Sequence, residues 1–83
     1  MTYQDVEEPI DVIAVFENSR MRPVRFKWKN RVYKVKQVTG TWISEIGRYR
    51  YRHFAVVDES TNFFELSFGE RDTNWTLTRI AAP

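Results

Sequence analysis

The chain has 83 residues, of which 42% are hydrophobic and 16% aromatic, so it can form one small folded core but not two domains. Its formal net charge is only +2, and it contains no cysteine, which excludes disulfides and thiolate metal sites and favours a cytoplasmic location. No apolar run reaches the length of a membrane span, and the acidic start MTYQDVEEPID lacks the basic region of a signal peptide, so no membrane partner is expected.

The beginning of the chain predicts a tail followed by a buried strand. Residues 1–8 are acidic and weakly patterned, and we expect a flexible N-terminus there, mobile or loosely paired, ahead of a single β domain at residues 9–83. Residues 10–16 are almost all apolar and predict a buried strand, with Pro9 at its start, where a missing N–H is tolerated. Asn18, Ser19 and Arg20 predict a turn.

The segment RPVRFKWKNRVYKVKQV predicts a β-hairpin with one apolar side and one basic side. A two-residue loop at Lys29 and Asn30 fits, because Asn tolerates a positive φ. Directly opposed like charges are mildly unfavourable, so the cations that face each other need an acid, a partner or exposure to water. The loop sets the register of the opposed pairs, which are Trp28 with Arg31, Phe26 with Tyr33, Val24 with Val35, and Arg25 with Lys34.

The second half of the chain predicts further short strands. One is expected near residues 41–43, within residues 37–46, with Gly40 at a bulge or bend and Gly47 in a loop. The run RYRYRHFAVV, residues 48–57, alternates arginine with tyrosine and then turns apolar, which predicts a strand that begins at a rim and ends in the core. A turn at 58–62, a strand at 63–68, a polar loop at 69–74 and a last strand at 75–80 complete the chain.

These elements predict an all-β fold, a single small antiparallel meander of about five to six strands. We expect it to curl into an SH3-like or similar rolled barrel, because closure removes exposed strand edges; a simple curled sheet is the alternative. The residues expected to be mostly buried in the core are Phe26, Trp28, Tyr33, Phe64 and Trp75.

Several segments together resemble a bacterial family of small domains of unknown function: EPIDV, RFKWKNRVYKVKQV, the isolated Trp42, RYRYRHFAVV, FFELSF and NWTLTRI. Members of that family show a PI-V strand, an F-W-x-x-R-x-Y-x-V hairpin, a lone Trp, a YY-R-V strand, a FEL-YF strand and a final W-x-L-x-R. The resemblance extends from Pro9 to Ile80. Such domains occur alone and as tails of proteins similar to Y-family DNA polymerases, which implies a link to DNA damage tolerance. The chain departs from this pattern at Asn30, where Gly is usual, and in the short segment after Trp42.

The sequence offers little for catalysis, and we expect no enzyme, no metal site and no cofactor. His53 is the one histidine, and Ser44, Ser60 and Ser67 lie in no nucleophile motif. Adjacent acids such as Glu7 and Glu8 point to opposite sides of a strand and do not chelate together. The three glycines are scattered, so no phosphate-binding loop is expected.

The charge distribution points to a binding role. Residues 20–52 hold eleven Lys or Arg and one acid, whereas the other 50 residues hold two basic and ten acidic side chains. Cations that track phosphates beside rings that stack on bases suit DNA or RNA. The candidate binding residues are Arg25, Lys27, Lys34, Lys36, Trp42, Arg48, Tyr49, Arg50, Tyr51 and Arg52.

Two alternatives to nucleic acid remain open. The first alternative is a protein–protein docking module, which would bind its partner through a sheet edge or through the arginine row. The basic side chains would also be explained if they only neutralise the acidic half across the sheet or protect strand edges from aggregation. The sequence leaves the oligomeric state open.

Overall fold

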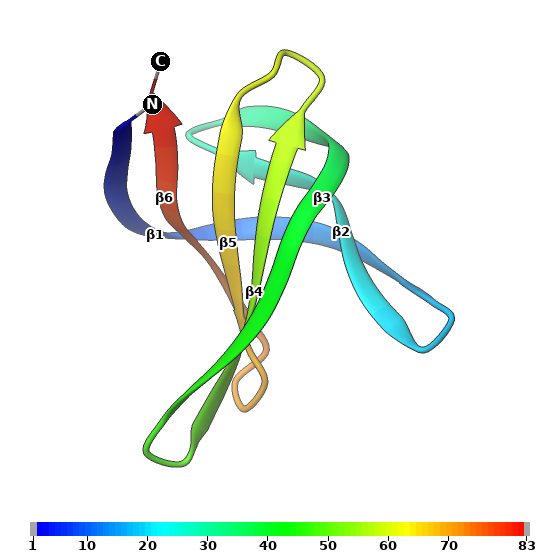
Figure 1. Cartoon of the computed structure of the whole chain (residues 1–83), viewed down its shortest axis with the longest axis vertical. Coiled ribbons are helices and arrows are strands. Elements are labelled where there is room, and N and C mark those ends of the chain that lie inside the picture. Colours follow the sequence, from blue (N-terminus) through cyan, green and yellow to red (C-terminus); the bar gives the residue numbers. More distant parts are fainter. Residues whose placement is uncertain (1, 83) are drawn as a thin grey trace.

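In a computed structural model, which describes residues 2–82, the alternating segments form six antiparallel strands and no helix (Figure 1). Each strand pairs with the next one along the chain, and the last pairs with the first, so the meander closes into a barrel. The predicted all-β, antiparallel rolled architecture is therefore confirmed. The strands are β1 (Thr2–Glu17), β2 (Arg20–Trp28), β3 (Arg31–Ile46), β4 (Tyr49–Asp58), β5 (Phe63–Gly69) and β6 (Asn74–Ala82).

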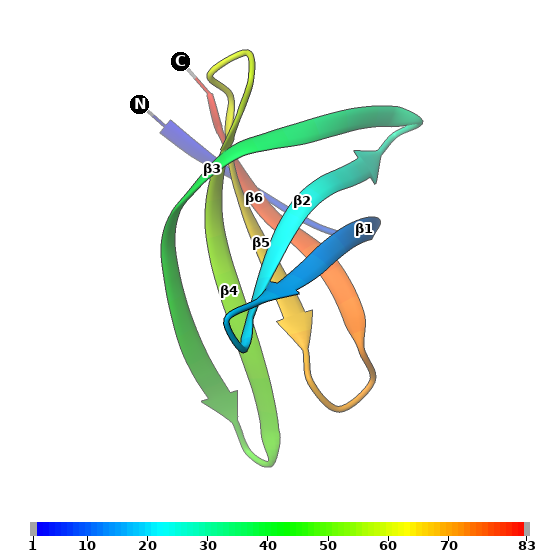
Figure 2. The ribbon, with the colours of Figure 1, turned by 90° about the vertical axis from the view of Figure 1, so that its right-hand side faces the viewer.

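Two long strands, β1 and β3, change partners within their length and so join two sheets. In β1, residues 2–10 pair with β6 and residues 11–17 pair with β2. In β3, residues 31–34 pair with β2, and residues 35–46 pair with β4. The short sheet β1–β2–β3 consequently crosses the longer sheet β1–β6–β5–β4–β3, as the two views show (Figures 1 and 2).

The acidic N-terminal segment is part of the barrel, in contrast to the flexible tail expected at residues 1–8. Tyr3 lies opposite Ala81 of β6, and Asp5 lies opposite Arg79. The Arg79 guanidinium also lies over the Tyr3 ring, 4.5 Å from its centroid. These cross-strand contacts, which the local pattern did not reveal, make residues 2–8 the beginning of β1. Met1 lies outside the described residues.

The β2–β3 hairpin has the predicted two-residue loop, with φ of 51° at Lys29 and 62° at Asn30. Phe26 faces Tyr33 and Arg25 faces Lys34, as the sequence predicts. The expected pair of Val24 with Val35 does not form. The pairing of β2 with β3 ends at Arg25 and Lys34, because β3 bends away and Val35 pairs with Asp58 of β4 instead.

The core fills the barrel with the inward-facing residues of all six strands. Phe26 and Phe64 are buried, at 1% and 5% exposed, as the sequence predicts. Trp28, Tyr33 and Trp75 are only partly buried and pack against the edge of the core. The most deeply buried apolar side chains also include Val56, Leu66 and Leu77, which belong to the central strands β4, β5 and β6.

Candidate nucleic-acid interface

Four cations form what we call the basic hairpin face: Arg25, Lys27 and Lys34 on the outward side of the short sheet, and Lys36 at the β3 bulge just beyond it, where the pairing with β4 begins. Arg25 lies directly opposite Lys34, and Lys27 lies opposite Val32 on one side and Asp11 on the other. All four side chains are exposed. None of them forms an ion pair within residues 2–82. The like charges are therefore left to water, or to a partner.

Apolar side chains lie at the centre of this face. Ile13 is 56% exposed and Val32 is 57% exposed, which is unusual for β-branched residues on a small domain. They line a shallow groove of about 300 Å³ together with Asp11, Val12, Arg25, Phe26 and Lys27. The rings of this hairpin, Trp28 and Tyr33, lie on its other side, where Lys29 covers Trp28 at 5.0 Å and Arg31 covers Tyr33 at 5.6 Å. The basic hairpin face thus presents charge and apolar surface but no free ring for stacking.

The arginines of the run RYRYRHFAVV lie on a different surface. The β3–β4 hairpin continues past the end of the barrel, and we call its residues 41–54 the arm (Figure 1). Arg50 and Arg52 alternate with the buried Phe54, so they extend the inward side of β4 beyond the core. Arg48 lies in the turn at residues 47–48, outside β4. β4 does begin exposed and end buried, as predicted.

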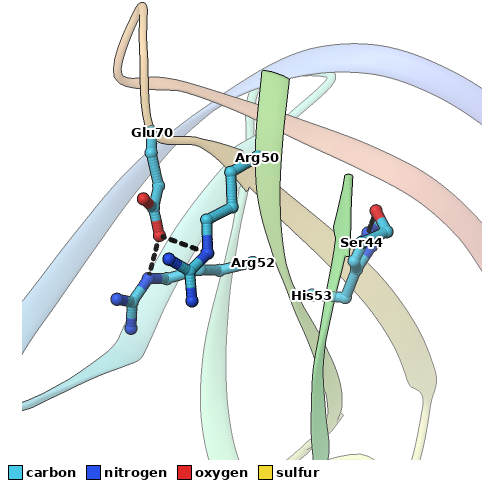
Figure 3. Close-up of polar contacts among 5 residues, drawn as sticks. All are labelled: Ser44, Arg50, Arg52, His53 and Glu70. Carbon is cyan, nitrogen blue, oxygen red and sulfur yellow. Dashed lines mark hydrogen bonds and ion pairs between the residues drawn. The ribbon is translucent and has the colours of Figure 1, made fainter. Parts of the chain in front are cut away.

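One carboxylate serves two of these arginines. Glu70 Oε2 accepts a hydrogen bond from Arg52 Nε at 2.5 Å and lies 3.9 Å from Arg50 Nε (Figure 3). The Glu70 backbone N–H also donates to the Arg50 carbonyl at 3.1 Å, which fixes the acid beside the strand. Glu45 lies opposite Arg50 in the register. The arginine row is therefore partly balanced by ion pairs with Glu70, whereas the basic hairpin face has Asp11 opposite Lys27 but no ion pair within residues 2–82.

The rings expected to accompany the arginines lie on the opposite side of the arm. Trp42 is opposite His53, and the two rings stack with centroids 5.1 Å apart. Tyr49 is covered by Arg71 at 5.0 Å, and the ring of Tyr51 lies against Gly69, where an added Cβ would come within 3.4 Å of it. Strand alternation separates the rings from the arginines, so the ten candidate residues form three surfaces rather than one ladder.

A pair that the sequence did not reveal lies on this outward side of the arm. Ser44 Oγ is 2.7 Å from His53 Nε2, within hydrogen-bonding distance (Figure 3). Burial lowers the pKa of His53, an effect that Glu65 and Glu7 partly offset. Within residues 2–82 no carboxylate forms a hydrogen bond with the other ring nitrogen, so the pair lacks the orienting group of a catalytic triad. The sequence signal for this pair was the turn at residues 47–48. A two-residue loop there sets the register of β3 with β4, and that register places Ser44 and His53 on the same side of the hairpin, near each other.

Residues 2–82 contain no group of three His, Asp or Glu side chains placed to hold a metal ion. In that range there is also no helix long and apolar enough to cross a membrane. Comparisons with protein-family models, with curated proteins and with solved structures found no match to this chain.

Proposed function

We propose that this domain is a non-enzymatic module that binds nucleic acid, and that it does so mainly through the basic hairpin face. One observation carries the proposal. Of the eleven Lys and Arg in residues 20–52, only Arg22, Arg50 and Arg52 form ion pairs, all within the described chain. If the basic segment and the acidic remainder of the chain served only to neutralise each other, the other cations of residues 20–52 would also be paired with acids across the strands.

The geometry of the face supports contact with phosphates rather than with bases. Arg25 and Lys34 face each other directly across the hairpin with no acid between them, so two like charges extend from neighbouring backbone positions. A row of phosphates relieves that repulsion and releases counterions, which favours binding at low salt. Because the neighbouring rings are covered by the protein's own cations, we expect binding that is largely independent of sequence.

The family resemblance supports DNA as the nucleic acid, with a place in DNA damage tolerance in the bacterial cytoplasm. Domains of that kind occur as tails of proteins similar to Y-family polymerases. A small module that holds the phosphate backbone would add affinity for DNA to a larger protein by raising its effective concentration there. The proposal about this process depends on the resemblance, whereas the proposal of phosphate binding depends on the unpaired cations.

The test compares two variants that each remove one exposed positive charge. NMR titrations with a short single strand and a short duplex would locate the surface, and affinities at several salt concentrations would give the salt slope. Arg25→Gln should weaken binding to all sequences alike and lower the slope by roughly one. Arg71→Gln, on the loop between β5 and β6, should leave the affinity and the salt slope unchanged. A wild-type domain that binds neither DNA nor RNA at low salt would rule the proposal out.

A further inference from the structure

The change of partners in β3 leaves two strand edges without a neighbour. Residues 20–24 of β2 pair with β1 but not with β3, whose pairing to β2 begins only at Arg25. Residues 35–46 of β3 pair with β4 on one side, and within residues 2–82 no strand pairs with their other side. The barrel closes only through the short β2–β3 pairing. Beyond that pairing, the β1–β2 turn and the arm diverge from each other (Figure 1).

A groove of about 480 Å³ lies between these two edges. One wall is the start of β2, and the other is the arm, whose strand β3 has the free edge. Ile43 is 49% exposed and Trp42 is 42% exposed, so apolar side chains flank an unpaired backbone. The lining residues are Arg20, Met21, Thr41, Trp42, Ile43, Arg52, His53 and Phe54.

The charge of the groove selects among the possible occupants. Its lining includes Arg20 and Arg52 but no acid. Arg20 forms no ion pair within the described chain, and Arg52 shares Glu70 with Arg50. A second copy of this chain would bring its own arginine-rich arm against these cations, which like-charge repulsion disfavours. A nucleic acid strand satisfies the arginines, but its phosphates accept hydrogen bonds only and leave the carbonyls of the free edge unpaired.

We propose that this groove binds an extended acidic peptide, which adds a strand to the free edge of β3. Such a peptide supplies both backbone donors and acceptors to the edge. Because strand side chains alternate, every second residue would lie on the inward side of the arm, beside Ile43, and the others on the side of Trp42. An acid at the first set of positions meets Arg20 across the groove, and an apolar residue at the second set covers Trp42. This inference does not depend on the proposed function.

The experiment uses the full chain and a blocked peptide of about ten residues in which glutamate alternates with valine. Backbone amide shifts in NMR should change at Met21, Thr41 and Ile43. Arg20→Glu should weaken the peptide's affinity roughly tenfold, as loss of one charge contact predicts. Arg25→Glu is the matched control on the other face, and it should leave that affinity unchanged while weakening nucleic-acid binding.

A second peptide tests the backbone pairing without any change to the protein. In this peptide every backbone nitrogen is methylated, which keeps the side-chain charges but removes the backbone N–H donors. The affinity of the methylated peptide should therefore be roughly tenfold lower or weaker still. Equal binding of both peptides would show charge attraction alone and overturn strand addition. The inference also fails if the acidic peptide moves no groove amide, or if only an oligonucleotide does. If Arg25→Glu loses oligonucleotide binding but retains peptide binding, nucleic acid and peptide bind at different surfaces, and each proposal can fail without the other.

Discussion

Trp42 lies flat against His53 on the outward side of the arm, with ring centroids 5.1 Å apart and planes within 5° of each other. The stack covers one side of the imidazole, and Ser44 lies 2.7 Å from its Nε2 atom. Burial lowers the pKa of His53, because the ring loses water that would stabilise its charged form. His53 is the only histidine, so its titration can be followed without overlap.

The lowered pKa predicts how stability depends on pH. The pKa is about 6.5 in the unfolded chain and lower in the folded one, so the unfolded chain takes up the proton first as the pH falls. The contribution of neutral His53 to stability is therefore complete above about pH 7 and is lost as the pH falls from there through the folded pKa. His53→Gln should abolish this part of the pH dependence in urea unfolding. An NMR titration midpoint at or above the unfolded value would contradict the prediction.

The β2–β3 turn predicts opposite effects for two substitutions of one residue. Asn30 has a φ of 62°, which glycine adopts freely and a β-branched residue resists. Asn30→Gly should leave the free energy of unfolding unchanged or slightly raised, whereas Asn30→Val should lower it by about 1–3 kcal/mol. Chemical denaturation of both variants checks this. Equal stability of the Val variant would mean that the turn relaxes without strain.

Phe26 should be the most costly aromatic residue to truncate. It is 1% exposed, stacks on Tyr33 at 5.1 Å and meets Phe64 edge-on at 5.0 Å. Phe26→Ala should cost about 3–5 kcal/mol, a large part of the stability of a domain this small. Val32→Ala, on the exposed side of the same hairpin, is the control and should cost less than about 0.5 kcal/mol. Denaturant midpoints would rank them.

Asp58 holds the turn between β4 and β5. Its side chain is buried and accepts hydrogen bonds from the backbone N–H groups of Ser60 and Asn62, at 2.9 and 2.8 Å, and from Asn62 Nδ2 at 3.0 Å. Asp58→Ala leaves these donors without their acceptor, and we expect a loss of about 2–3 kcal/mol. Glu59→Ala next to it should have little effect, because Glu59 is exposed. Thermal melts of the two variants would show whether the turn depends on this one carboxylate.

The arginine row should matter little for folding. Arg50 and Arg52 have side chains that are 49% and 43% exposed, and exposed ion pairs contribute at most about 1 kcal/mol. Replacement of Arg48, Arg50 and Arg52 by Gln should therefore keep the melting temperature within a few degrees, and circular dichroism would follow it. Glu70→Gln should leave two arginines unpaired and tighten the binding of any polyanion to the arm. Unfolding of the triple variant would show that the row is structural.

Much of the fold follows from local alternation. The two-residue loop at Lys29 and Asn30 determines that Phe26 faces Tyr33, because a shift by one residue would place every apolar side chain in water. A bulge or bend at Gly40 was predicted from the glycine itself, and the register of β3 with β4 does shift between Val38 and Gly40. These features depend only on residues that are neighbours in the sequence or across one short turn.

The candidate binding surface was predictable only in part. Arg25, Lys27 and Lys34 lie on one side of the hairpin, as alternation with the core residues of two adjacent strands predicts. Arg50 and Arg52 do not continue that row. Those arginines share a side with the buried Phe54, whereas Lys34 lies on the outward side of β3. Sequence alternation gives the two sides of each strand but does not say which side of one strand continues which side of another.

The sequence by itself therefore determined the strands, their turns, the register of the β2–β3 hairpin and the segregation of charge. Only the tertiary structure decided that residues 2–8 pair with β6, that Glu70 balances two arginines, and that β3 leaves β2 after Lys34. These features join residues far apart in the chain, and they form only when the meander closes and its favourable contacts offset the entropy of bringing distant strands together. The bend of β3 that closes the barrel is also what leaves its edge free.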